Sequence, residues 1–221
     1  CDVTEAEQVE TLMQTAVDHY GRLDVLVNNA GVESWEGPIT ELDIDGWRRD
    51  MDINVLGVAL GIKYAAPRMA PGSTIINIAS LFGLLPIPTL SSYNASKAAV
   101  IHLTKTAAVE LGPVGIRVYA LCPTGLTHDS YLGRVEGVDN WLDDWLKLAH
   151  QHVSELGHAD DCAALVHYLA SDDARFINAQ IIAVDDGASA GTSLTAMEAA
   201  IGQKAEWTDD DPFLEVPPVD S

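Results

Sequence analysis

Three short, largely apolar runs without regular polar alternation constrain the fold of this chain most. They cover residues 25–27, 73–79 and 116–123. A strand that is apolar on both sides packs helices against both of its faces. Segments with apolar residues at helical spacing flank these runs, over residues 4–20, 43–70, 92–111 and 159–171, and a last strand is expected at 180–187. The alternation predicts an α/β protein in which a doubly wound parallel sheet lies between two helical layers.

Helix start and stop signals refine two of these elements. Thr4, followed three residues later by Glu7, predicts a capping box, and Gly21 predicts the end of the first helix. The helix over residues 43–70 is expected to end before Pro71 and Gly72.

The charge balance excludes several classes of function. The formal net charge is -21, from 33 acidic and 12 basic residues. Such a surface repels phosphate backbones and anionic membranes. No apolar run reaches the roughly 18 residues of a membrane span, and the first residues do not resemble a signal peptide. We therefore expect a cytoplasmic protein with no nucleic-acid or membrane partner.

Three widely spaced cysteines, Cys1, Cys122 and Cys162, form no CxxC pair. This spacing predicts buried free thiols rather than a disulfide framework, and we expect no metal site. Residues 1–190 are expected to form the α/β domain. Residues 191–221 form an acidic extension that contains prolines, either a partly disordered arm or an arm that docks on a neighbouring subunit.

Tyr93 and Lys97 are spaced to lie on one face of a helix. A nearby ammonium favours the phenolate, so we expect Lys97 to lower the pKa of Tyr93 and to make it a proton-transfer group. An ordinary surface pair is the alternative. Ser80, thirteen residues before Tyr93, follows a predicted buried strand and is placed to bind a substrate oxygen. Asn54 lies in the middle of a helix, where asparagine is unfavourable, and either holds a water next to Lys97 or bonds to the backbone.

Taken together, these motifs resemble those of the short-chain dehydrogenase/reductase family. The motifs are NNAG at residues 28–31, N-x-x-G at 54–57, Ser80 with Tyr93 and Lys97, and a proline after the third strand. The resemblance covers residues 1–190 and implies a Rossmann-like fold of the single-domain branch. It implies that Tyr93 is the general acid/base, that Lys97 supports it, that Ser80 orients the substrate and that Asn54 holds a relay water.

The same resemblance implies an NAD or NADP cofactor. The positions that match its binding residues are Asp2, Val3, Asn29, Ala30, Gly31, Tyr93, Lys97, Pro123, Gly125 and Thr127. The family's glycine-rich turn is missing, and the sequence starts near the expected third strand. We therefore expect a piece of a longer chain, which lacks the first βαβ elements, folds poorly alone and binds dinucleotide weakly. The residue that selects NAD or NADP belongs to those elements, so both cofactors stay open.

Further departures occur after residue 116, where Tyr119 and Thr124 replace the family's usual asparagine and glycine. Apolar residues in the segments next to the site predict a hydrophobic, cyclic alcohol or ketone as substrate. With Ser80, the candidate substrate residues are Leu85, Tyr131, Trp141 and Trp145. Packing of these residues on the core or on a subunit is the alternative.

We expect an NAD(P)-dependent oxidoreductase that interconverts a secondary alcohol and a ketone. A non-catalytic dinucleotide sensor or scaffold is the alternative from another class, although such a protein does not need all four catalytic residue types. An epimerase or dehydratase of the same family is the enzymatic alternative. The resemblance also implies a homodimer or homotetramer, formed through the helices predicted at 43–70 and 92–111.

Overall fold

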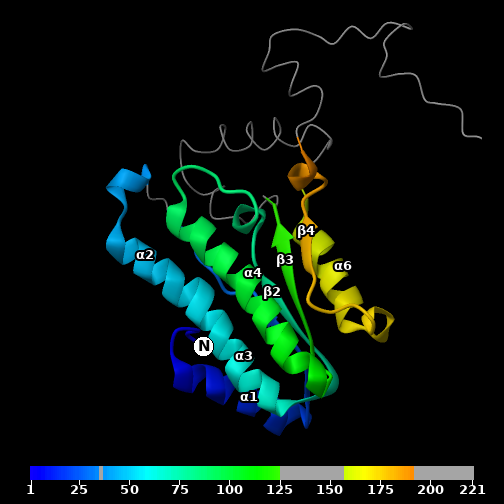
Figure 1. The fold of residues 1–221 in the computed structure, drawn as a ribbon. Coiled ribbons are helices and arrows are strands. Elements are labelled where there is room, and N and C mark those ends of the chain that lie inside the picture. Colours follow the sequence, from blue (N-terminus) through cyan, green and yellow to red (C-terminus); the bar gives the residue numbers. More distant parts are fainter. Residues whose placement is uncertain (35–36, 125–156, 192–221) are drawn as a thin grey trace, which may run out of the picture.

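The computed structural model describes residues 1–34, 37–124 and 157–191. Four parallel strands form one sheet in the order β1-β2-β3-β4, and helices lie on both of its faces (Figure 1). The strands are β1 (Leu23–Asn28), β2 (Met69–Ile78), β3 (Arg117–Pro123) and β4 (Ile181–Val184). The α-helices are α1 (Ala6–Tyr20), α2 (Ile44–Met51), α3 (Gly57–Ala65), α4 (Ser91–Leu111) and α6 (Ala159–Ala170). The prediction of a parallel, Rossmann-like α/β sheet is therefore confirmed.

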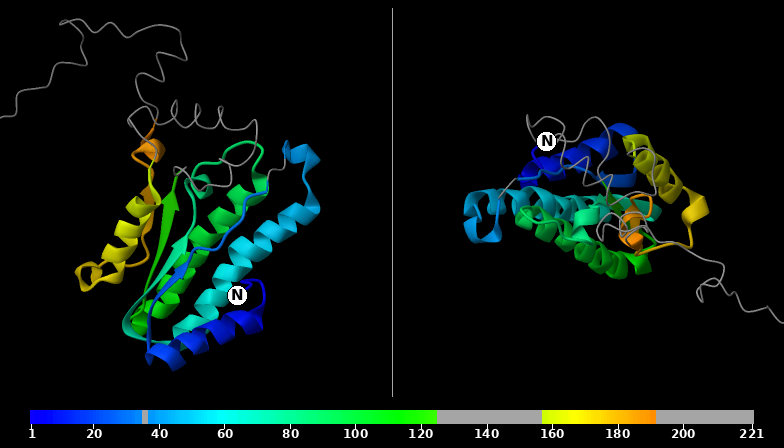
Figure 2. Two further views of the ribbon diagram at one scale, coloured as in Figure 1. Left: turned by 180° about the vertical axis from the view of Figure 1, so that it is seen from behind. Right: turned by 90° about the horizontal axis from the view of Figure 1, so that it is seen from above.

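Successive side chains along each strand point to opposite faces of the sheet, so each face has its own hydrophobic core. Ile75 and Val118 pack with residues of α1, α3 and α4 on one face of the sheet. Their neighbours Ile76 and Tyr119 point to the other face, where Leu169 of α6 covers them. All five side chains are almost completely buried. Seen from above, the sheet lies between α4 and α6 (right-hand view of Figure 2).

Strand β1 is less covered than its sequence predicts. Leu26 is buried toward α3, but Val25 and Val27 on the opposite face are 38% and 40% exposed. Val27 pairs in register with Ile76, which is fully buried. Because α6 packs over the central strands, its cover does not extend to β1 at the edge of the sheet. The expectation that this strand is covered on both faces is wrong for the described residues.

The helix predicted at 43–70 is in fact two α-helices joined by a π-helical turn. This turn spans Asp52–Leu56 and separates α2 from α3. A π turn inserts one residue into the helical ladder and is frequent at functional sites. The helical segment also ends earlier than predicted, since Met69 already pairs with Leu23 in the sheet. A register shift follows this pair and leaves Pro71 and Gly72 inside β2.

Helix α1 begins differently from the prediction. Glu5 is its N-cap and makes no side-chain capping bond, whereas Thr4 donates its hydroxyl to Asp2 over 2.8 Å. The predicted capping box with Glu7 is therefore wrong. Gly21 ends the helix with a φ of 78°, as predicted.

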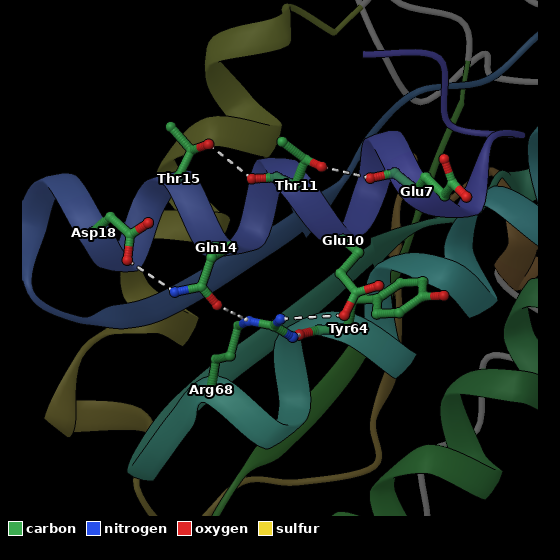
Figure 3. Close-up of polar contacts among 8 residues, drawn as sticks. All are labelled: Glu7, Glu10, Thr11, Gln14, Thr15, Asp18, Tyr64 and Arg68. Carbon is green, nitrogen blue, oxygen red and sulfur yellow. Dashed lines mark hydrogen bonds and ion pairs between the residues drawn. The ribbon is translucent and has the colours of Figure 1, made fainter.

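A cluster of polar contacts ties α1 to the end of α3 (Figure 3). The Arg68 guanidinium donates to the Gln14 side chain over 3.1 Å and to the Tyr64 carbonyl over 2.8 Å. It also pairs with Glu10 at 3.5 Å. These contacts lie at the amino ends of the strands, so they anchor the helical layer far from the carboxyl edge.

Tyr119, one of the departures from the family pattern, has a packing role. Its ring is fully buried on the α6 face, and its hydroxyl donates to the Ile177 carbonyl. Arg117 donates to the same hydroxyl over 3.1 Å and to the Leu169 carbonyl over 2.8 Å. The tyrosine therefore fixes the turn after α6 and points away from the face that carries α4.

Candidate active site

Three strands end where the candidate residues gather. Asn29 to Gly31 follow β1, Ser80 follows β2, and Pro123 is the last residue of β3. In parallel sheets this carboxyl edge is where ligands bind. Helix α4 begins at the same edge, so Tyr93 and Lys97 occupy its first two turns. The structure thus brings the predicted catalytic residues together.

The side-chain hydroxyls of Ser80 and Tyr93 lie beside each other, and Ser80 favours the phenolate form of Tyr93. Ser80 caps a short 3-10 turn, Leu81–Gly83, by accepting from the Phe82 amide over 3.2 Å. The backbone of this turn packs tightly on α4 at Gly83. A Cβ added there would lie only 2.8 Å from the Lys97 carbonyl carbon. The lack of a side chain at Gly83 therefore allows the serine to approach the tyrosine.

Lys97 is buried beneath the tyrosine. Its Nζ donates to the Ile78 carbonyl over 3.0 Å and lies 5.5 Å from the centre of the Tyr93 ring. Burial lowers the pKa of Lys97 to about 8, while Cys122 and Glu33 oppose this shift. The lysine therefore loses its charge near the upper end of the physiological pH range.

The pKa of Tyr93 departs from the prediction. Burial raises it above the ordinary value of a phenol, the Glu33 carboxylate adds to the rise, and the hydrogen bond from Ser80 opposes it. The expectation that Lys97 gives Tyr93 a lowered pKa is therefore wrong for this arrangement. The physical reason is that burial of the phenol and the Glu33 carboxylate outweigh the groups that favour the phenolate.

Asn54 sits in the π turn and is almost fully buried. Its Oδ1 accepts from the Val32 amide over 2.8 Å, and its Nδ2 donates to the Val32 carbonyl over 2.8 Å and to the Ser96 hydroxyl over 2.9 Å. Both amide protons are therefore used on protein partners, as the backbone-bonding alternative predicts. The relay water stays a prediction.

Two carboxyl groups of this site escaped the sequence analysis. Asp50 is completely buried and accepts from the Ser34 amide and from the hydroxyls of Ser34 and Ser92. Glu33 interacts electrostatically with Asp50 and Lys97, and burial raises its pKa to about 7. The spacing of four between Asp50 and Asn54 puts both on one helix face and was the available signal.

The remaining predicted positions are distributed over the edge and beyond it. Asn29, Ala30 and Gly31 are exposed, and Pro123 is half-buried. Leu85 is 46% exposed. Asp2 is exposed, while Val3 packs against Gly57 of α3. The other five predicted positions lie outside the described residues: Gly125, Thr127, Tyr131, Trp141 and Trp145.

The residues at this edge fit the nicotinamide-ribose half of a dinucleotide. A Cβ on Gly31 would lie 3.2 Å from Asn54 Oδ1 and 3.3 Å from Lys97 Nζ. The chain after β1 thus presents exposed backbone without a side chain directly beside a buried ammonium.

Within the described residues, no group of three or more histidine, cysteine or acidic residues is placed to hold a metal ion. None of the described helices is both long and apolar enough to span a membrane.

The chain resembles proteins of known class over most of its length. A family profile described as "Enoyl-(Acyl carrier protein) reductase" matches residues 1–189. The human protein "Dehydrogenase/reductase SDR family member 4" is 37% identical over 189 residues, which cover 85% of this chain and 67% of that protein. "Cis-4-hydroxycyclohexanecarboxylate dehydrogenase" of Sinomonas cyclohexanicum is 39% identical over 191 residues, which cover 86% and 75%.

Solved structures agree with these relatives. Levodione reductase matches with a TM-score of 0.81 and 31% identity, over 86% of this chain and 76% of that chain. ElxO with NADP bound matches with a TM-score of 0.79 and 33% identity, over 86% and 77%. Profile, relatives and folds all match the segment that carries the sheet and the Ser80–Tyr93 pair, and the chain belongs to the short-chain dehydrogenase/reductase family of NAD(P)-dependent oxidoreductases.

Proposed function

We propose that this protein interconverts a secondary alcohol and a ketone, with Tyr93 as the general acid/base. The observation that carries the proposal is the placement of Ser80 and Tyr93 together at the carboxyl edge of the sheet, with Lys97 directly behind the tyrosine ring. A hydroxyl pair of this kind binds one oxygen atom from two sides. That oxygen is the carbonyl oxygen of a ketone or the hydroxyl oxygen of an alcohol.

In the direction of reduction, Ser80 and Tyr93 each donate a hydrogen bond to the ketone oxygen. The nicotinamide, when bound, supplies the hydride to the carbonyl carbon. Tyr93 gives its proton to the oxygen as negative charge develops there, and Ser80 holds that oxygen in place. Lys97 contributes positive charge beneath the tyrosine while it is protonated, which stabilises the phenolate left behind. Oxidation of an alcohol reverses each transfer.

We propose a cyclic, largely apolar substrate. Ile87 and Leu90 are buried and pack with Phe82 and Tyr93 into an apolar cluster beside the reacting hydroxyls. The names of relatives support this class, since they include cis- and trans-4-hydroxycyclohexanecarboxylate dehydrogenases and levodione reductase. The solved ElxO structures contain NADP or NADPH, which makes NADP a cofactor to test beside NAD.

We also propose a homo-oligomer, either a dimer or a tetramer. Leu56 at the start of α3 and Val109 on α4 are 42% and 74% exposed, which leaves apolar side chains for a helical interface. A non-catalytic sensor is the competing function, and it predicts cofactor binding without turnover.

The test follows the absorbance of reduced nicotinamide with NAD and NADP and a panel of cyclic alcohols and ketones. The proposal predicts turnover in the wild type. Tyr93→Phe is expected to bind the cofactor with nearly unchanged affinity and to lose turnover. Cofactor binding without turnover of any secondary alcohol or ketone by the wild type would favour the sensor.

A further inference from the structure

The segment after β1 holds a carboxyl group that the proposed chemistry leaves without a role. Glu33 lies two residues after Gly31 and is largely buried. Its Oε1 is inaccessible to solvent and has no hydrogen-bond partner among the described residues. A buried carboxyl oxygen without a partner is costly, so its presence here calls for a physical reason.

The residues on either side fix Glu33 in position. Val32 is held by two hydrogen bonds to the Asn54 side chain, and Ser34 is held by two hydrogen bonds to Asp50. Both Asn54 and Asp50 belong to the buried face of the α2–α3 segment. Because the same two side chains also bond to Ser96 and Ser92, they hold the backbone around Glu33 against the first turns of α4, which carry Tyr93 and Lys97.

Charged groups on two elements of the described structure interact electrostatically with Glu33. From α2 the Asp50 carboxylate disfavours ionisation of Glu33, and from α4 the Lys97 ammonium favours it. Tyr93, also on α4, experiences the Glu33 carboxylate more strongly than that of Asp50. Cys122 of β3 acts on Lys97 rather than on Glu33.

We propose that Glu33 is a positioning residue whose protonation state controls how readily Tyr93 accepts a proton. This inference rests on the proposed role of Tyr93. When Glu33 is neutral, the proton affinity of Tyr93 is determined by burial, Ser80 and Asp50. An ionised Glu33 puts a second negative charge near the phenolate and opposes its formation. Alcohol oxidation needs Tyr93 as a proton acceptor and is the direction in which this control acts.

The sign of the linked stability change follows from the pKa of Glu33. That pKa rises from 4.5 to about 7 on folding, so the native state binds this proton more tightly than the unfolded state. The contribution of Glu33 to stability is therefore present below pH 4.5 and is lost as the pH rises toward 7. Glu33→Gln removes the titration. Between these pH values the Glu33→Gln protein is expected to become progressively more stable than the wild type. The ratio of the two unfolding equilibrium constants is expected to change by up to about tenfold per pH unit.

The experiment measures kcat/KM for alcohol oxidation against pH in the wild type, Glu33→Gln and Glu33→Asp. The part of the pH profile in which kcat/KM changes with the ionisation of Tyr93 is expected to move to lower pH in Glu33→Gln, by on the order of one pH unit. Glu33→Asp keeps a carboxylate and is expected to keep this part of the profile closer to the wild-type position. Glu33→Thr is a second neutral variant that must reproduce the shift. Glu41→Gln, an exposed site on another segment, is the matched control and is expected to leave the profile unchanged.

Urea unfolding of the same variants against pH gives a readout that does not depend on turnover. An unshifted profile in both neutral variants would overturn the proposal, whatever their stability. If Tyr93→Phe stays active, the proposed function itself fails. If Tyr93→Phe is inactive and the neutral Glu33 variants keep the wild-type profile, only the role of Glu33 fails.

Discussion

Removal of the Asn54 side chain tests whether the π turn holds the segment after β1 in place. Asn54→Ala deletes three buried hydrogen bonds, two to the Val32 backbone and one to the Ser96 hydroxyl. At about 1 kcal/mol for each bond, the free energy of unfolding is expected to fall by about 3 kcal/mol. Because Val32 lies next to Glu33 and Gly31, the variant is also expected to lower kcat/KM.

The assay pairs urea denaturation with amide hydrogen exchange at Val32. Thr104→Val is the matched control, since Thr104 is fully buried in α4, where its hydroxyl accepts from the Asn77 side chain and donates to the Val100 carbonyl. It is expected to cost about 2 kcal/mol of stability and to leave kcat/KM close to the wild-type value. An Asn54→Ala protein with wild-type stability and a slowly exchanging Val32 amide would refute this reasoning.

Two further substitutions test the packing that shapes the site. Gly83→Ala places a Cβ 2.8 Å from the α4 backbone, so the Ser80 turn is expected to move away from Tyr93 and kcat to fall. Gly112→Ala, with no atom nearer than 3.4 Å, is the control for this loss, and equal activity of the two variants would contradict the account. Tyr119→Phe leaves the partly buried Ile177 carbonyl without its donor and is expected to lower the free energy of unfolding by about 1–3 kcal/mol in a urea experiment, with little change in KM. Wild-type stability of Tyr119→Phe would contradict that assignment.

The fold and the position of the candidate site residues in it were predictable because local patterns report them. The apolar runs of β2 and β3 and the helical spacing around Val100 and Ala107 report burial, and the structure buries most of these residues. Asn54 was detectable because asparagine is unfavourable inside a helix, and its burial accounts for that exception.

Other features depend on tertiary contacts that no local pattern encodes. The exposure of Val25 and Val27 follows from how far α6 extends across the sheet. The electrostatic effect of Asp50 on Glu33 joins segments that are distant in the sequence. The raised pKa of Tyr93 follows from its burial and from Glu33, whereas the spacing to Lys97 alone predicts the opposite sign.

The most direct test of the central claim is single-turnover hydride transfer with Tyr93→Phe and a cyclic secondary alcohol. The phenylalanine keeps the ring in its apolar cluster with Ile87 and Leu90 and removes only the hydroxyl beside Ser80. The account predicts a rate about 10²- to 10⁴-fold below the wild type, with cofactor affinity nearly unchanged. A wild-type rate in Tyr93→Phe would contradict it.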